Sequence, residues 1–465
     1  MIETLPDDVL LKIFKFFVNA IYSYYSPSEE WRTLVHVCRK WRNLAFTFPR
    51  HLNLQLHSRP SKRSVKEMLD TWPELPTYIR AFDYKAKETI DNVVAALRLN
   101  HRVSGIRFEA LSDSAWETFA PLVQQPFPTL TYLWIEPYFP TNVISRSFLG
   151  GSAPSLRVLH LGCISFPTLP ELLPSATGLV RLWYDDIPPS GYIPPQAMVA
   201  GLSALTRLES LSLTFRHDSL RVPDRTIRIP PLPTRILLPA LTHLCFQGVP
   251  EYMEDLVAQI DAPLLESMVM ELSYQEVPDV SELAKFVRRA DKLSLIDRAE
   301  VIFESRSIYI KLSQELLEGI VNPKTLRLYP ACLESDLRFS YLAQFCASCL
   351  PNLTLFESLQ IRVPFYHRWE DIIVDPGPQW LELLRPFNPV KKLYLSKYVA
   401  PHVTQTLRGL SAERVMEVLP ALEKVFVSNL ETLGPVREAI SAFVDARQLS
   451  GHPVLIGDWE GGYYI

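Results

Sequence analysis

Few residues in this chain have the types and spacing that catalysis or metal binding needs. Cys346 and Cys349 form a lone C-x-x-C pair, which is the spacing found in zinc sites and dithiol redox centres. A structural zinc site also requires two further thiol or imidazole ligands. The sequence supplies neither a second such pair nor a nearby histidine. We therefore favour helix packing for the two cysteines, with zinc or redox chemistry as the alternative.

The histidines and glycines do not indicate a catalytic centre either. Four histidines fall in the N-terminal third without metal-ligand spacing, namely His36, His51, His57 and His101. We find no glycine-rich phosphate-binding motif, no G-x-S-x-G and no H-E-x-x-H. With 16 glycines in 465 residues, the chain offers little backbone for cradling phosphates. We expect no catalytic residue, no metal ligand and no cofactor. An enzyme whose site is assembled from several distant segments would leave no local motif, and it stays open as an alternative.

The overall composition excludes several classes of partner. The apolar content of 48% allows a large core, and the formal charge of −4 gives no reason to expect nucleic acid or an anionic membrane as a partner. The first residues, Met1–Asp8, are acidic and do not resemble a secretory signal. No apolar run approaches the ~20 residues of a membrane span. The six cysteines are scattered as expected of reduced thiols. We expect a cytoplasmic and/or nuclear protein.

An apolar-x-x-apolar-x-apolar pattern recurs over most of the chain. It is clearest in Leu156–Leu161, and it is weakest at Ala290 and Pro323, where Leu293-Ser-Leu295 and Leu326-Arg-Leu328 follow in frame. Its first positions are Ile79, Val103, Leu130, Leu156, Leu179, Leu208, Leu241, Leu265, Ala290, Pro323, Phe356, Val390 and Leu422. A fixed apolar skeleton at a spacing of roughly 20–30 residues is typical of a leucine-rich solenoid. The alternative is a set of unrelated buried strands in an ordinary α/β domain.

The pattern predicts a parallel sheet with helices on its outer side. Each alternating pair is a short strand whose apolar residues share one face, and neighbouring strands must stack to bury that face. Segments with helical spacing separate the strands: Ser64–Trp72, Thr89–Leu99, Asp113–Val123, Glu251–Ile260, Val280–Arg288, Leu337–Cys349, Gln379–Leu384, Ser411–Leu419 and Val436–Ala446. We expect an α/β horseshoe with one continuous parallel sheet from about Ile79 to Val427. Its buried leucines should include Leu159, Leu161, Leu182, Leu211, Leu213, Leu244, Leu393 and Leu395.

Residues 4–46 read as a separate helical hairpin. Pro6, Asp7 and Asp8 suit a first helical turn, and the apolar side chains that follow sweep roughly 220° of that helix at ~100° per residue. This arc is wider than a surface helix needs. A second helix from Trp31 to Ala45 carries its own apolar face. A piece this small cannot bury so much apolar surface, so something else must cover it.

The hairpin resembles an F-box. The resemblance lies in Leu5-Pro6, Val9-Leu10 and Ile13-Phe14, followed by Leu34, Val37-Cys38, Trp41-Arg42 and Leu44. Together with the repeats, it is similar to the divergent, fungal-type F-box/leucine-rich-repeat family. The repeats depart from a common pattern, because the asparagine or cysteine that often follows each strand is missing. The resemblance divides the chain into an F-box at 1–63 and a repeat solenoid at 64–465.

The resemblance also implies a function. F-box proteins dock a Skp-type adaptor and so join a cullin ligase, the SCF-type E3 ubiquitin ligase that drives ubiquitin-dependent degradation. The chain would then be a non-catalytic substrate receptor whose repeats bind a protein client. The alternative is a Skp-binding scaffold without ubiquitin transfer. By resemblance, the adaptor-binding residues are Leu5, Pro6, Val9, Leu10, Ile13, Phe14, Leu34, Val37, Cys38 and Trp41.

The client surface is expected on the concave face, where the residues between the apolar strand positions lie. In the last five repeats these residues include five bases and no acid. We hypothesise that this face binds an acidic or phosphorylated client segment through Arg327, Arg362, Lys392 and Lys424, flanked by Tyr329 and Tyr394. Trp134 and Trp183 in the early repeats are the second candidate surface. The alternative is that these residues bind no client and form only the solvated side of the sheet.

Overall fold

The computed structural model describes most of the chain. The described residues are 5–21, 32–48, 56–58, 75–82, 87–137, 143–216, 235–273, 279–293, 296–304, 307–314, 324–331, 335–349, 357–363, 379–410, 414–428 and 434–459. The chain forms two compact units, Met1–Ile193 and Pro194–Ile465. Each unit is considered by itself below.

Unit 1 begins with three helices rather than the predicted pair. They are α1 (Asp7–Ile21), α2 (Arg32–Val37) and α3 (Arg39–Thr47). The predicted second helix is interrupted at Cys38, which is extended with φ −158° and ψ 171°. Its Sγ accepts a hydrogen bond from the Trp41 backbone N–H at 3.5 Å and so caps α3. An N-cap needs this non-helical backbone, which the helical spacing of apolar residues does not reveal.

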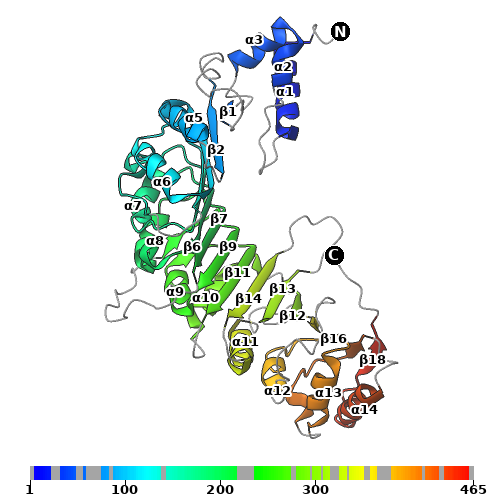
Figure 1. The fold of residues 1–465 in the computed structure, drawn as a ribbon. Helices are drawn as coiled ribbons and strands as arrows, with labels where there is room; N and C mark the ends of the chain where they lie inside the picture. Colours follow the sequence, from blue (N-terminus) through cyan, green and yellow to red (C-terminus); the bar gives the residue numbers. More distant parts are fainter. Residues whose placement is uncertain are drawn as a thin grey trace. The chain divides into compact units, whose positions relative to one another are not determined.

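The rest of unit 1 is a parallel sheet with helical connections (Figure 1). Its strands pair in chain order: β1 (Leu56–Ser58), β2 (Thr77–Phe82), β3 (Val103–Leu111), β4 (Tyr132–Pro137), β5 (Val158–Gly162) and β6 (Arg181–Ile187). Its α-helices are α5 (Lys87–Leu97), α6 (Asp113–Phe119) and α7 (Leu169–Leu172). Strand β4 shows the expected alternation, with Leu133 and Ile135 buried and the residues between them half-buried.

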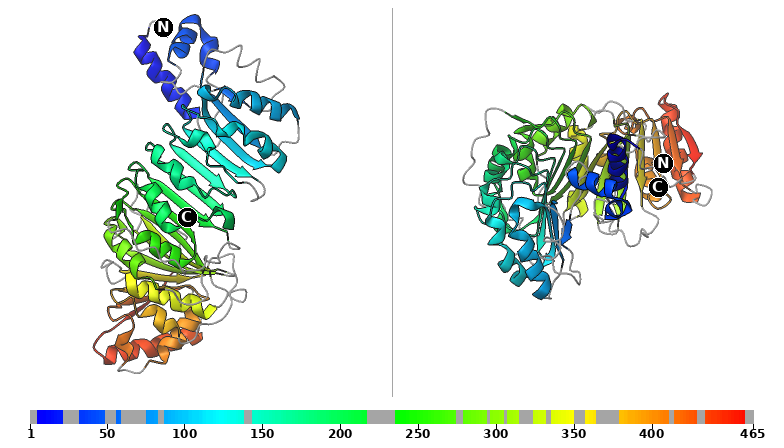
Figure 2. Two further views of the ribbon diagram at one scale, coloured as in Figure 1. Left: turned by 90° about the vertical axis from the view of Figure 1, so that its left-hand side faces the viewer. Right: turned by 90° about the horizontal axis from the view of Figure 1, so that it is seen from above.

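Unit 2 continues the same architecture. Its sheet runs in the order β7 (Ser210–Phe215), β9 (His243–Gly248), β11 (Ser267–Ser273), β14 (Thr325–Ala331), β13 (Ser307–Ser313), β12 (Arg298–Glu304), β15 (Ser358–Arg362), β16 (Lys392–Leu395), β17 (Lys424–Val427) and β18 (Leu455–Asp458). A small second sheet pairs β8 (Ile236–Leu237) with β10 (Ile260–Asp261). The helices are α8 (Pro195–Leu202), α9 (Pro250–Val257), α10 (Ser281–Arg289), α11 (Ser335–Cys349), α12 (Gln379–Leu384), α13 (Ala400–Arg408) and α14 (Gly434–Leu449). Helices α9, α10 and α11 lie on one face of this sheet (Figures 1 and 2).

One part of unit 2 contradicts the prediction of a purely parallel sheet. Strand β13 pairs antiparallel with both β12 and β14. The predicted strand around Leu293 is also wrong: Leu293 lies in a turn after α10, and the strand begins at Arg298. Ala299, Val301 and Phe303 fill the core positions of β12. The chain therefore returns through a second strand here instead of a helix.

The helix predictions are largely confirmed, with one clear error. Segments predicted from Thr89, Asp113, Glu251, Val280, Leu337, Gln379 and Val436 correspond to α5, α6, α9, α10, α11, α12 and α14. The helix predicted at Ser411–Leu419 is only a short 3₁₀ turn at Val415–Glu417, whereas α13 was missed. The predicted helix at Ser64–Trp72 lies outside the described residues.

The core and the outer features agree with the repeat pattern. All eight leucines predicted to be buried are at most 2% exposed.

Cys346 is a buried free cysteine on α11, and within the described residues no cluster of histidine, cysteine or carboxylate side chains has metal-site geometry. No described helix combines the length and the apolar character that crossing a membrane requires. The predicted α/β fold, with a helical N-terminal domain followed by stacked strand–helix repeats, is thus confirmed.

Candidate functional site

The N-terminal helices expose some of the predicted adaptor-binding residues and bury others. Ile13 is 44% and Val37 59% exposed, and Pro6 is also exposed. The half-buried members of the set are Leu5, Val9, Cys38 and Trp41. The buried members are Leu10, Phe14 and Leu34. The accessible part of the predicted set therefore centres on Pro6, Ile13 and Val37.

The buried members of this set hold the helices together. The rings of Phe14 on α1 and Trp41 on α3 meet edge to face with centroids 4.8 Å apart. Lys40 Nζ donates to the Leu5 carbonyl at 2.9 Å and pairs with Asp7 at 3.3 Å, which fixes the start of α1 against α3. Leu10, Phe14 and Leu34 are 0–6% exposed, so we reassign them from adaptor contact to internal packing.

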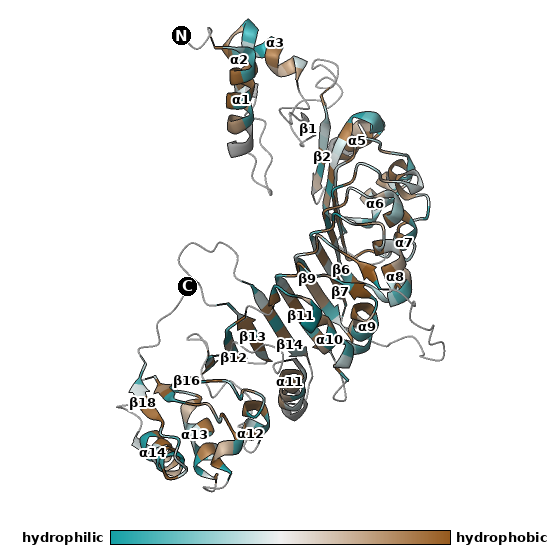
Figure 3. Cartoon of the chain, turned by 180° about the vertical axis from the view of Figure 1, so that it is seen from behind, coloured by the Kyte–Doolittle hydropathy of each residue, from teal (hydrophilic) through white to brown (hydrophobic). Residues whose placement is uncertain are grey.

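Two further exposed aromatic residues on these helices lie outside the predicted adaptor-binding set. Phe16 is 78% and Phe48 43% exposed, and Figure 3 shows the apolar residues of α1 and α2 in brown. The over-wide apolar arc of α1 was the signal for Phe16, although the sequence does not show which residues of that arc stay outside. With Ile13 and Val37, these two residues form what we call the exposed apolar set.

The sheet face of unit 1 that is turned away from the apolar core carries a stack of rings. We call this face, in either unit, the open face. Strand pairing places Arg107, Trp134, His160 and Trp183 side by side on β3, β4, β5 and β6. The Trp134 and His160 rings stack at 3.7 Å between centroids with an angle of 6°. The Arg107 guanidinium lies 4.6 Å over the other side of Trp134, and Trp183 meets His160 edge-on at 5.7 Å. We call these four residues the ring stack.

Acidic partners balance the charge around the ring stack. Glu109 pairs with Arg107 and also with Arg80 at 3.1 Å, and the Trp134 indole N–H donates to Glu136 at 3.1 Å. Burial, and then the positive charge of Arg107, lower the pKa of His160 to about 4. The imidazole is therefore neutral near pH 7. Arg107 and His160 are each 7% exposed, so the stack is mostly enclosed.

The open face of unit 2 carries basic residues around one buried acid. Glu300 on β12 is 6% exposed. Its carboxylate lies 3.5 Å from Arg298, 3.7 Å from Lys311 and 3.3 Å from Arg362. Arg327 lies directly across β14–β13 from Lys311. We call Arg298, Lys311, Arg327 and Arg362 the basic cluster.

Aromatic rings flank the basic cluster. Tyr309 and Tyr329 stack with centroids 4.4 Å apart. Burial raises the pKa of Tyr309 to about 12, with smaller opposing effects of Arg362 and Arg327. Its hydroxyl therefore stays protonated and can donate near pH 7. Farther along the sheet, the rings of Tyr394 and Phe426 stack at 4.8 Å, and Lys392 faces Lys424 across β16–β17.

The structure thus brings the predicted client residues together only in part. Arg327, Tyr329 and Arg362 each lie near Tyr309 on β13. Lys392, Tyr394 and Lys424 form a second group on β16 and β17. The prediction missed Arg298, Lys311 and Tyr309 because it placed the repeat at Leu293 instead of on the β12–β13 hairpin. The expectation that this face holds no acid is wrong, since Glu300 lies at its centre.

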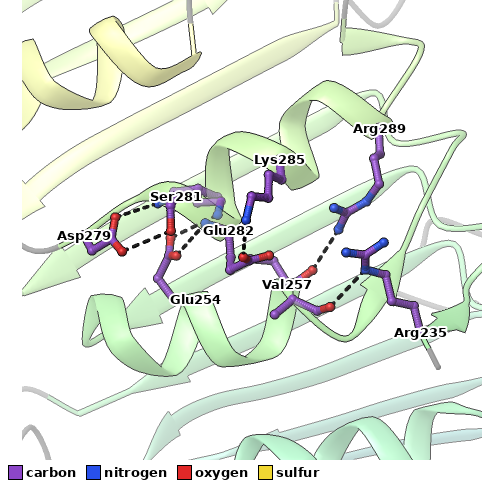
Figure 4. A network of polar contacts seen from close by, with 10 residues as sticks. Arg235, Glu254, Val257, Asp279, Ser281, Glu282, Lys285 and Arg289 are labelled. Carbon is purple, nitrogen blue, oxygen red and sulfur yellow. Dashed lines mark hydrogen bonds and ion pairs between the residues drawn. The ribbon is translucent and has the colours of Figure 1, made fainter. Parts of the chain in front are cut away.

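The helical side of unit 2 holds a separate polar network (Figure 4). The Glu254 carboxylate on α9 accepts the backbone N–H groups of Glu282 at 2.8 Å and Leu283 at 3.0 Å, and so caps α10. Burial raises the pKa of Glu254 to about 7 despite these two bonds. Arg235 and Arg289 bind the carbonyls of Ala258 and Val257 at the other ends of the helices. We assign this network to helix packing.

Comparisons with known proteins bear on the N-terminal helices and the repeats. Residues 2–52 match the family model described as F-box-like. No curated protein sequence matches the chain. Among solved structures, a leucine-rich repeat-containing protein, LegL7 from Legionella pneumophila, aligns over 84% of this chain and 97% of its own, with 11% identity and a TM-score of 0.24. This likeness is too distant to carry an argument about function. The family match and the repeat architecture are together those of an F-box domain followed by leucine-rich-type repeats.

Proposed function

We propose that this protein is the client-recognition subunit of an SCF-type E3 ubiquitin ligase. Its helical domain would dock a Skp-type adaptor, and its repeats would hold a protein client near the cullin-bound ligase. The proposal rests on the match of residues 2–52 to the F-box-like family model, together with the exposed apolar set that the helices of this region carry. We assign the chain no catalytic step of its own, and we place its action in the cytoplasm and/or nucleus.

The adaptor surface would consist of accessible residues on the three N-terminal helices. A contiguous exposed apolar patch marks an interaction site, and we propose that the exposed apolar set forms such a patch. Ile13, Phe16 and Val37 would supply the apolar contacts, together with Pro6 and the partly exposed Leu5, Val9, Cys38 and Trp41. Leu10, Phe14 and Leu34 would act indirectly by fixing the helices.

The client surface would lie on the open faces of the repeats. Rigid sheets present fixed side chains to a partner, and aromatic residues with arginine are the types that most often anchor interfaces. The candidates are Trp134 and Trp183 in unit 1, and Arg327, Tyr329, Arg362, Lys392, Tyr394 and Lys424 in unit 2. None of these residues is needed for the apolar core of the sheet, so their substitution tests recognition without removing core packing.

Adaptor binding by the full chain tests the proposal. Changing Ile13→Asp together with Val37→Asp places charge in the proposed apolar interface, and we expect co-purification with a Skp-type adaptor to be lost. Leu237→Asp with Leu264→Asp is the matched control, because these leucines are 55% and 44% exposed but lie in unit 2. Adaptor capture that survives the first pair of changes, with folding verified by circular dichroism, would refute docking through this surface.

A further inference from the structure

The open face of unit 1 carries a row of acids next to the ring stack. Strand pairing sets Glu109 on β3 level with Glu136 on β4, and Gly162 on β5 level with Asp185 on β6. The pairing of β4 with β5 one residue earlier brings these two pairs to the same level. We call Glu109, Glu136 and Asp185 the acid row.

The bases nearest to the acid row bind only one end of it. Arg80 and Arg107 both pair with Glu109 on β3. The contact that Glu136 makes within the described residues is with the neutral indole N–H of Trp134, at 3.1 Å. The negative charge of Glu136 is therefore stabilised by a dipole and not by a cation.

Asp185 is the more accessible acid at the β6 end of the row. Its side chain is 31% exposed, compared with 16% for Glu109. Arg181, the base on the same strand, precedes it by four residues, which is about 13 Å along a strand. The Arg181 guanidinium lies 6.0 Å over the Trp183 ring. A side chain that approaches this end of the row therefore meets both a carboxylate and an aromatic ring.

His160 gives an independent indication of a ligand. Its side chain is 9% exposed, and its Nδ1 is buried without a hydrogen-bond partner in the described part of the chain. Asp185 Oδ2 lies 3.8 Å from this nitrogen, which is too far for a direct hydrogen bond. An unsatisfied buried polar atom costs free energy. A donor group placed between Nδ1 and Oδ2 would satisfy both atoms.

We propose that the acid row and His160 bind the ammonium group of a lysine in a protein client. This deepens, and rests on, the proposed role in client recognition. An ammonium has three donors and a positive charge, so it can bond His160 Nδ1 and Asp185 Oδ2 together while it compensates Glu136. A water molecule would satisfy the same two atoms but would leave the acids without a counter-charge. The aliphatic stem of the lysine would pack against the half-buried rings of Trp134 and Trp183.

The probe is a degenerate peptide pool with one fixed lysine, blocked ends and no other base, and its binding to the full chain is followed by fluorescence anisotropy. The matched pool carries Nε-acetyl-lysine at the fixed position, which keeps the stem and removes the charge. We expect the lysine pool to bind at least about 10-fold more tightly than the acetyl-lysine pool, and the difference should shrink as salt is added. Spermidine and unlabelled lysine peptide serve as competitors.

Two variants and one control locate the site. Glu136→Gln with Asp185→Asn should weaken binding of the lysine pool about 10-fold or more. Glu136→Gln alone should weaken it too, and its amide oxygen can still accept the Trp134 N–H if the double variant folds poorly. Glu117→Gln with Glu171→Gln removes the same charge from exposed positions on α6 and α7 and should have little effect.

The lysine proposal is overturned if the lysine and acetyl-lysine pools bind alike, if the acid-row variants bind like the control, or if spermidine displaces the labelled pool at lower concentration than unlabelled lysine peptide. Each result is read beside adaptor co-purification by the same protein. Adaptor binding that persists while lysine-peptide binding fails would leave the receptor proposal standing. Loss of both would remove its basis.

Discussion

The open faces of the two units use equivalent strand positions in different ways. In unit 1, the Arg107 guanidinium lies over the Trp134 ring, Trp134 stacks on His160, and Glu109 beside them is already paired. In unit 2, the bases around Glu300 outnumber it and stay partly exposed. The two open faces therefore differ in how far their charged side chains are enclosed: Arg107 is 8% exposed, whereas Arg298 and Arg362 are 26% and 32% exposed.

The largest effect should be common to both units, because their cores are built alike. Leu182 in unit 1 and Leu211 in unit 2 are both fully buried. We expect Leu182→Ala and Leu211→Ala each to lower the free energy of unfolding by about 2–5 kcal/mol. Leu237→Ala, at a 55% exposed position, should cost less than about 0.5 kcal/mol. Denaturant unfolding measures all three, and similar costs for the buried and exposed leucines would contradict the shared core.

Removing the central acid of the open face should lower the free energy of unfolding more in unit 1 than in unit 2. Glu109→Gln leaves the guanidinium of Arg107, 8% exposed, without its partner, and we expect a loss of about 3 kcal/mol. Glu300→Gln leaves three bases that water already reaches, so the expected loss is about 1 kcal/mol. Denaturant unfolding of the two variants decides the point. An equal loss in the two variants, or a larger loss in Glu300→Gln, would mean that the two faces do not differ as described.

The smallest effects concern pH, and their signs are opposite in the two units. The folded pKa of His160 is lowered to about 4 from 6.5, so its contribution to stability grows as pH rises from about 4 to 6.5. The folded pKa of Glu254 is raised to about 7 from 4.5, so its contribution to stability diminishes as pH rises from 4.5 to about 7. We expect stability between pH 5 and 7 to slope more steeply downward with pH in His160→Phe than in wild type. In Glu254→Gln, the slope of stability against pH should become more positive than in wild type. A slope that does not change in one of these variants would contradict the shifted pKa of the residue that it replaces.

The sequence was sufficient for features encoded by local pattern. Alternation around Leu159, Leu182 and Leu393 predicts buried strands because the side-chain period of a strand is two. The helical domain was recognisable from Leu5-Pro6 and the Val37-Cys38 ending, although Cys38 breaks the second helix through backbone geometry that periodicity does not encode.

Features that depend on pairing between distant segments were harder to predict. Leu293 and Leu295 fit the repeat pattern by spacing, but the β12–β13 hairpin is selected by its fit between β14 and β15. This error concealed Glu300, Arg298 and Lys311, and with them the difference between the two open faces. The sequence also could not show that Phe14 is buried and Phe16 exposed, because both lie in one apolar arc of α1.

Affinity purification of the full chain with degradation blocked tests the central claim most directly. Wild type is compared with the Ile13→Asp/Val37→Asp variant, and adaptor, cullin and ubiquitin-modified proteins are quantified by mass spectrometry. We predict that the variant loses adaptor and cullin but captures the same clients, and that those clients no longer carry ubiquitin. Undiminished adaptor and cullin in the variant, or client ubiquitination that does not depend on them, would contradict the receptor function.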